Sequence, residues 1–77
     1  MMSNKHLITG EETAYEILAL LESVPIGARA ILAIDNKEYT VDRDGSYTYF
    51  LMEEGVVISS SDRTDVAAEI QCIARGA

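Results

Sequence analysis

The sequence predicts an α+β domain in which an antiparallel β-meander of three to four strands is flanked by an N-terminal and a C-terminal helix (α-β-β-β-β-α). Three observations predict it. Apolar residues recur with helical spacing only near the two ends of the chain, turn-forming pairs divide the middle into short strand-like runs, and 77 residues suffice for one domain at most. We therefore assign residues 1–9 to a flexible N-terminus and residues 10–77 to a single small α+β domain.

The first helix is expected from residue 10 to residue 23. Thr9 and Glu12 have the spacing of a capping box, with Thr9 as the N-cap and Glu12 at the third helical position. An apolar stripe follows at helical spacing, formed by Ala14, Ile17, Leu18, Leu21 and Val24. Pro25 and Gly27 then end the helix, because proline lacks the backbone donor and glycine favours a left-handed cap.

Four short strands are expected in the middle of the chain, over residues 28–34, 38–43, 46–52 and 56–59. The pairs Asp35-Asn36, Asp44-Gly45 and Glu54-Gly55 separate them, and each pair is expected to form a two-residue hairpin turn. A turn of this kind fixes which residues lie opposite one another across the hairpin, and therefore which face of the sheet each side chain occupies.

These three turns divide the side chains of the sheet between two faces. The first face is nearly all apolar and is expected to pack against helices; it holds Ala30, Leu32, Ile34, Tyr39, Val41, Phe50, Met52 and Val57. The second face has an apolar centre and charged margins, and holds Arg29, Ile31, Ala33, Glu38, Thr40, Asp42, Tyr47, Tyr49, Leu51, Val56 and Ile58. Arg29 lies opposite Asp42 in this register, as expected of a cross-strand ion pair.

The second helix is expected after the serine-rich segment that ends at Asp62. Ser60, Ser61 and Asp62 offer alternative N-caps, and Gly76 ends the helix. Its apolar stripe consists of Val66, Ile70 and Ile73, with Ala67 and Ala74 beside it. The pattern leaves open whether this helix packs on the same face of the sheet as the first helix or covers the second face.

The composition excludes several classes of function. The net charge is −7, with thirteen acidic residues against six basic ones, which opposes direct binding to nucleic acids and to anionic membranes. The apolar runs are too short to span a bilayer, and no targeting segment is recognised, so we expect a cytoplasmic protein. A single cysteine, Cys72, rules out an internal disulfide and is typical of a reducing compartment.

No catalytic, cofactor-binding or metal-binding motif is found, and we expect a protein that is not an enzyme. A calcium loop aligned on Gly45 would place Thr40 and Leu51 where the two anchoring carboxylates are required. Cys72 is expected to be a small buried side chain of the second helix, and His6 belongs to the flexible terminus. The serines before the second helix lack the nucleophile elbow that a catalytic serine of this kind requires. The paired carboxylates lie at turns and helix starts, where capping or solvated charge explains them.

The second face of the sheet is the candidate functional surface. A small domain with an open apolar patch is expected to contact another protein, as a homodimer or as an accessory subunit. The expected partner-binding residues are Arg29, Ile31, Tyr47, Tyr49, Leu51 and Ile58, and Tyr49→Glu is expected to break the assembly without loss of helix. The alternative is an acidic inhibitor or nucleic-acid mimic that binds a basic site on another protein.

Overall fold

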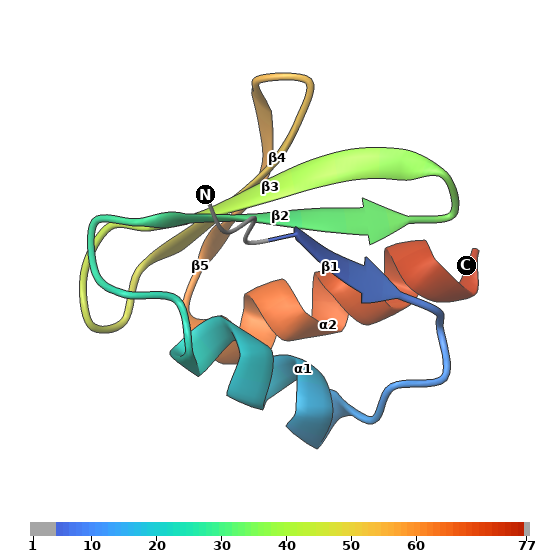
Figure 1. Cartoon of the computed structure of the whole chain (residues 1–77). Helices are drawn as coiled ribbons and strands as arrows, with labels where there is room; N and C mark the ends of the chain where they lie inside the picture. The colour runs from blue at the N-terminus through green and yellow to red at the C-terminus, as the bar shows by residue number, and fades with distance from the viewer. Residues whose placement is uncertain (1–4, 77) are drawn as a thin grey trace.

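The computed structural model of the chain describes residues 5–76, which form two helices and one five-stranded sheet (Figure 1). The elements are β1 (Lys5–Ile8), α1 (Ala14–Glu22), β2 (Arg29–Ile34), β3 (Lys37–Arg43), β4 (Tyr49–Glu53), β5 (Val56–Ser61) and α2 (Arg63–Arg75). The strands follow one another across the sheet in chain order, with β1 parallel to β2 and all other neighbours antiparallel. The predicted α+β class is confirmed, with one strand more than expected.

That additional strand is β1, which occupies part of the segment assigned to a flexible terminus. Its side chains alternate across the sheet: Ile8 is buried in the core and His6 is half-buried, whereas Leu7 is 73 % exposed on the other side. The strand pairs in parallel with β2 and is joined to it through α1, so these three elements form a βαβ unit. Residues 1–4 of the predicted terminus lie outside the described residues.

Helix α1 begins four residues later than predicted, and the prediction of a capping box at Thr9 is wrong. The structure places the capping box at Thr13, whose hydroxyl accepts the backbone N–H of Glu16 at 3.1 Å while the Glu16 carboxylate accepts the N–H of Thr13 at 2.9 Å. Gly10 has a φ of 96°, so a right-handed helix cannot run through it. Thr9 and Glu12 form a separate turn, in which the Glu12 carboxylate accepts a hydrogen bond from the Thr9 N–H at 2.9 Å.

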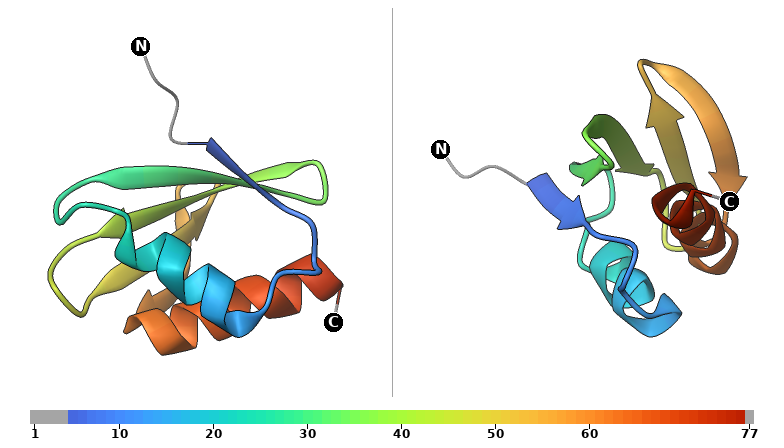
Figure 2. Two further views of the ribbon diagram at one scale, coloured as in Figure 1. Left: turned by 60° about the horizontal axis from the view of Figure 1, so that its bottom comes forward. Right: turned by 90° about the vertical axis from the view of Figure 1, so that its right-hand side faces the viewer.

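Helix α2 has the predicted ends, with Asp62 as N-cap and Gly76 as a left-handed C-cap. Both helices lie side by side beneath the same face of the sheet, which answers the question that the sequence left open (Figures 1 and 2). An ion pair joins them, with the Arg63 Nε and the Glu22 Oε2 2.9 Å apart.

The core fills the space between the helices and this face of the sheet. Its buried members include Ile8, Ile17, Leu21, Leu32, Ile34, Tyr39, Val41, Tyr49, Leu51, Val66, Ala67 and Ile70. The expectation that Cys72 is buried is wrong: the residue lies in α2 but its side chain is exposed.

Two of the three predicted turns are confirmed. Asp35 and Asn36 have φ values of 52° and 66°, and Glu54 and Gly55 have values of 53° and 82°, as a type I′ hairpin turn requires. The pairing of β2 with β3 follows from the first of these turns and agrees with the prediction along the whole ladder.

The third predicted turn, at Asp44-Gly45, is wrong. The connection from β3 to β4 is a five-residue loop over residues 44–48, and the φ of Gly45 is not positive. Arg43 therefore lies opposite Tyr49 instead of Ser46, and Val41 lies opposite Leu51 instead of Thr48. This shift of three residues along β4 exchanges the two faces of the strand, because side chains alternate with a period of two.

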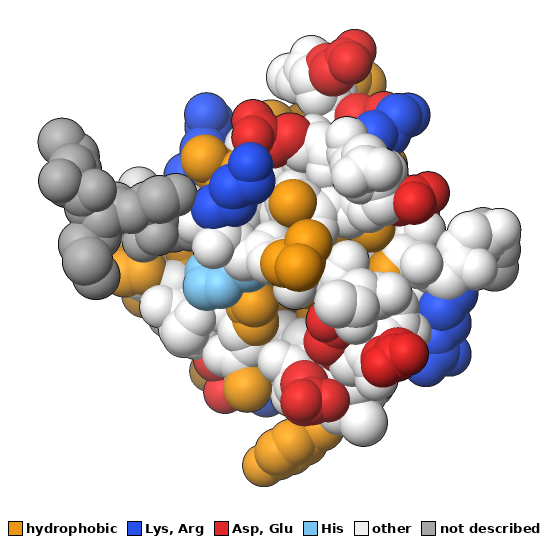
Figure 3. Space-filling model, turned by 45° about the vertical axis from the view of Figure 1, so that its right-hand side comes forward, with side chains coloured by type: hydrophobic (Ala, Val, Ile, Leu, Met, Phe, Trp, Pro, Cys, Tyr) orange, Lys and Arg blue, Asp and Glu red, His pale blue; other side chains and the backbone are white. Residues whose placement is uncertain are grey.

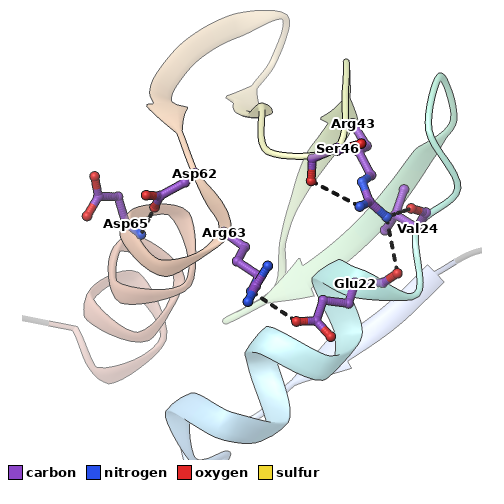
Figure 4. A network of polar contacts seen from close by, with 7 residues as sticks. All are labelled: Glu22, Val24, Arg43, Ser46, Asp62, Arg63 and Asp65. Atoms are coloured by element: carbon purple, nitrogen blue, oxygen red, sulfur yellow. Dashed lines mark hydrogen bonds and ion pairs between the residues drawn. The ribbon is translucent and has the colours of Figure 1, made fainter.

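The side chain of Arg43 explains why the longer loop is preferred (Figure 4). Its guanidinium donates hydrogen bonds to the carbonyl oxygens of Val24 at 2.9 Å, Ser46 at 3.1 Å, and Glu22 and Gly45 at 3.2 Å. It also lies 5.3 Å from the centre of the Tyr49 ring, within the range of a cation–π contact. One side chain thus holds the end of α1, the β3–β4 loop and the first residue of β4 together.

The second hairpin, β4–β5, contains a bulge that the turn rule did not predict. Met52 lies opposite Val57, as expected, but Leu51 lies opposite Ser59, so Ile58 is an additional residue in β5. A bulge of this kind bends the strand and changes the face of the residues beyond it.

We predict that Arg43→Lys destabilises the fold by about 1–3 kcal/mol, because a lysine cannot reproduce the planar fork that reaches several carbonyl oxygens. Urea denaturation measures this loss. Arg75→Lys, at the exposed end of α2, is the matched control and should leave the unfolding midpoint unchanged. Equal midpoints for the two variants would contradict the proposed importance of Arg43.

We predict that Tyr49→Phe stabilises the protein by about 0.5–2 kcal/mol, since a buried hydroxyl without a partner keeps its desolvation cost. The Tyr49 hydroxyl is fully buried and has no hydrogen-bond partner among residues 5–76. Thermal unfolding followed by circular dichroism measures the change, with the exposed Tyr15→Phe as control. A lower melting temperature for Tyr49→Phe alone would show that the hydroxyl makes a stabilising interaction.

Candidate interaction surface

The face of the sheet opposite the helices is not covered by any other element of residues 5–76, and we call it the open face (Figure 2). Residues that pair directly across neighbouring strands share a face, so the ladder assigns the side chains of the open face to three rows. The central row crosses all five strands and contains Lys5, Ile31, Thr40, Met52 and Val57. The two flanking rows contain Leu7, Ala33 and Glu38 on one side, and Arg29, Asp42, Phe50 and Ser60 on the other.

Apolar side chains lie on the open face on either side of β3, whose own residues on that face are the polar Glu38, Thr40 and Asp42. Ile31, Phe50 and Met52 are half-buried by their neighbours in the sheet, whereas Val57 at the edge is 50 % exposed. Because the helices do not reach this side, part of each of these side chains remains in contact with water. Partly exposed apolar side chains of this kind favour association with another surface that excludes the water.

The open face is hollowed on both sides of Arg29. One hollow, of about 430 Å³, lies at the β2–β3 strand ends and includes Asp42, Arg43 and Phe50 in its wall. The other, of about 410 Å³, lies towards the opposite turns and includes Thr40, Met52 and Gly55. Both hollows are open to solvent and are lined by polar and apolar groups together.

Ion pairs neutralise the charged positions of the sheet. Arg29 and Asp42 form the predicted cross-strand pair, with two hydrogen bonds between guanidinium and carboxylate, one of them 2.9 Å long. The Lys5 ammonium lies 3.5 Å from the Glu38 carboxylate on the same face. A third pair, Lys37 with Glu53 at 3.0 Å, lies at the end of the sheet. In Figure 3, the basic side chains at the top of the view lie directly beside acidic ones.

The pKa values of the paired groups respond to these contacts. The hydrogen bond from Arg29 lowers the pKa of the Asp42 carboxyl below its usual value, and the carboxylate raises the pKa of Arg29 in turn. The hydrogen bond to Glu53 raises the pKa of the Lys37 ammonium. The contacts thus favour the ionised forms of Asp42, Arg29 and Lys37, and the two opposite charges of each pair offset each other at the surface.

The structure brings only two of the six predicted partner-binding residues to the open face, namely Arg29 and Ile31. Tyr49 and Leu51 were placed there by the incorrect turn and are buried in the core, at 1 % and 0 % exposure. Tyr49→Glu would therefore bury an unpaired charge and unfold the domain, instead of breaking an assembly selectively.

The other two predicted residues lie beside the open face. Tyr47 is in the β3–β4 loop and is 75 % exposed, and Ile58 is the additional residue of the β5 bulge and is 39 % exposed. The prediction missed Leu7, Phe50, Met52 and Val57, which occupy the open face instead. The sequence signal that could have placed Phe50 and Met52 on the open face is Arg43. An arginine at the end of a half-buried strand needs hydrogen-bond acceptors close by.

Two other kinds of feature are not found in the described part of the chain. Residues 5–76 contain no group of three or more His, Cys, Asp or Glu side chains placed to hold a metal ion. Neither of the two helices within this range combines the length and the apolar content needed to cross a membrane. Comparison with protein-family models, with curated proteins and with solved structures gave no match.

We predict that the Asp42 pair contributes stability above the ordinary carboxyl pKa of 3.8, and that this contribution is lost as the pH falls through the lowered pKa of the folded state. In Arg29→Gln, the pKa of Asp42 should rise towards its ordinary value, and the loss of stability in acid that this carboxyl causes should become smaller. A carboxyl ¹³C NMR titration measures the pKa in both proteins. Identical titration midpoints would show that Arg29 does not stabilise the ionised carboxylate.

Proposed function

We propose that this protein is a small non-enzymatic protein-binding module of the cytoplasm whose open face packs against a second copy of the chain. The observation that carries the proposal is the position of both helices on one side of the sheet, which leaves Ile31, Phe50, Met52 and Val57 of the open face uncovered by any other element of residues 5–76. We call these four side chains, which lie on β2, β4 and β5, the apolar row. A domain of this size has a small core, and association is one of the ways in which such domains gain stability.

The distribution of charge favours a second copy over other occupants. Three of the six basic residues, Lys5, Arg29 and Lys37, form ion pairs on the sheet, so these pairs carry no net charge. The whole net charge of −7 therefore belongs to residues outside the pairs. Two copies of an acidic chain repel each other least when they meet through a neutral and apolar surface.

Burial of the apolar row supplies the driving force in this arrangement. Each large apolar side chain that becomes fully buried contributes roughly 1.5–3 kcal/mol before the cost of ordering is subtracted. Ile31, Phe50 and Met52 are already held by the sheet, so little side-chain entropy is lost when two open faces meet. If the partner is a different protein, the chain acts as its accessory subunit through the same surface.

A second candidate function rests on the acidic residues outside the sheet pairs. Glu11, Glu16, Asp65 and Glu69 are all exposed on the helices or on the connections that lead into them. Such a surface is suited to a basic site on another protein, as an inhibitor or a nucleic-acid mimic would use it. Binding through carboxylates weakens steeply with added salt, whereas association through the apolar row does not.

We predict that the wild-type chain is a dimer and that Met52→Glu raises the dissociation constant of the dimer at least about tenfold, since tenfold corresponds to about 1.4 kcal/mol. Met52 lies in the centre of the apolar row, and a charge there must be desolvated when two faces meet. Sedimentation velocity over a range of concentrations measures the constant. Circular dichroism establishes that the variant retains its helices.

The matched control is Tyr15→Glu, which introduces the same charge on α1, on the opposite side of the sheet, at a residue that is 81 % exposed. This variant should dissociate at the same concentration as the wild type. A wild-type chain that stays monomeric at millimolar concentration would overturn the homodimer, and an equal effect of both variants would show that the contact lies elsewhere.

A further inference from the structure

The strand β5 forms one edge of the sheet, and its outer side is not paired with any strand of residues 5–76. It carries no charged side chain along its whole length, Val56–Ser61, although a quarter of the residues in the chain are charged. Three consecutive apolar residues of this edge are exposed: Val56 at 63 %, Val57 at 50 % and Ile58 at 39 %. Edge strands are normally protected by lysines, prolines or a covering element, because their unpaired backbone groups bind other strands.

The other edge of the sheet is different. β1 has only four residues, begins with Lys5 and holds that lysine in an ion pair with Glu38 of β3. A charged side chain on a short strand discourages the addition of a further strand. The two edges are thus unequal, and only β5 combines an exposed backbone with uncharged side chains.

Acidic groups stand at both ends of β5. Before it stand Glu53, the last residue of β4, which is paired with Lys37, and Glu54 in the turn. After it stand Asp62, which caps α2, and Asp65, whose carboxylate accepts a hydrogen bond from the Ser61 hydroxyl. An added strand therefore meets negative charge at each end and an apolar, uncharged stretch between them.

This charge pattern decides which strand fits. If two copies paired through β5 in antiparallel orientation, the Glu54 turn of each would lie beside the Asp62 segment of the other, and like charges would face each other. A strand with basic residues at its ends and β-branched residues between them would instead form favourable contacts at both ends. The bulge at Ile58 confines regular pairing to short stretches, so the side-chain and charge contacts select the ligand.

We propose that the β5 edge binds an extended segment of another protein by strand addition, and that this segment has an uncharged β-branched centre and basic ends. Hydrogen bonds to the backbone of β5 supply the pairing, and the carboxylates at the two ends supply the selectivity. The proposal does not depend on the dimer described above, because the outer edge of β5 stays free when two open faces meet.

The test uses three synthetic peptides with blocked termini and a centre of alternating valine and threonine. The first has two lysines at each end, the second has two glutamates at each end, and the third is the lysine peptide with alternate backbone nitrogens methylated. Fluorescence anisotropy measures binding to the full chain, and the ¹⁵N–¹H spectrum of the protein reports which amides shift. We expect the lysine peptide alone to bind, and the shifts to concentrate in β5.

The matched pair of variants is Glu54→Lys and Glu11→Lys, which change the charge equally beside β5 and far from it. Glu54→Lys should weaken binding of the lysine peptide by about three- to tenfold, as expected for the reversal of an exposed charge, and Glu11→Lys should leave it within about twofold. Met52→Glu, which is designed to break the dimer, should still bind the peptide, so failure of one proposal is distinguishable from failure of the other.

Three results would overturn the proposal. Equal binding of the methylated peptide would show that the backbone edge is not used, and equal binding of the glutamate peptide would remove the charge argument. Absence of binding of the lysine peptide at millimolar concentration would show that β5 does not accept a strand. If Glu54→Lys strengthened self-association in sedimentation velocity and the peptide did not bind, the occupant of the edge would be a second copy of this chain.

Discussion

The fold depends on the hydrogen bonds of one guanidinium. Arg43 donates to the carbonyl oxygens of Glu22 and Val24 at the end of α1 and to those of Gly45 and Ser46 in the following loop, and it stacks on Tyr49. Carbonyl groups at the end of a helix have no partner within the helix, so this side chain satisfies groups that would otherwise need water. The same contacts fix the length of the loop and thereby the register of β4. The assignment of the β4 side chains to the core or to the open face follows from that register.

How much of the fold can be predicted from the sequence depends on whether each feature is decided locally. Asp35, Asn36 and Gly55 adopt positive φ values because these residue types tolerate the left-handed region, and Glu54 adopts one beside Gly55. Asp44-Gly45 has an equally strong local preference, but the interactions of Arg43 with residues twenty positions earlier outweigh it. β1 was not predictable from its own residues, because a four-residue strand held by its parallel neighbour and one buried side chain, Ile8, leaves no periodic signal.

The same reasoning explains why the sequence identified the existence of a surface but not its members. Both faces of β4 are apolar, with Tyr49 and Leu51 on one and Phe50 and Met52 on the other, so either register buries two large side chains. Burial energies therefore do not distinguish the registers, and a polar network does. Arg29 and Ile31 were assigned correctly because β2 is fixed by a turn whose geometry is local. An open apolar face was expected in both registers, and only the residues that form it changed.

The open face and the β5 edge differ in where their charged side chains lie. The ion pairs of Arg29 with Asp42 and of Lys5 with Glu38 remove net charge from the open face, so an identical face can approach it without repulsion. The β5 edge is uncharged along its length and has acidic residues at both ends, of which Glu53 is paired with Lys37 and Asp62 caps α2. This excess of negative charge is the reason for proposing a basic strand, and not a second copy, as its ligand. The neutral open face and the acidic ends of β5 are thus the basis for proposing different partners for two neighbouring surfaces of one small sheet. The proposed difference in partner rests on the positions of a few charged side chains, because the apolar side chains of the open face and of the β5 edge are alike.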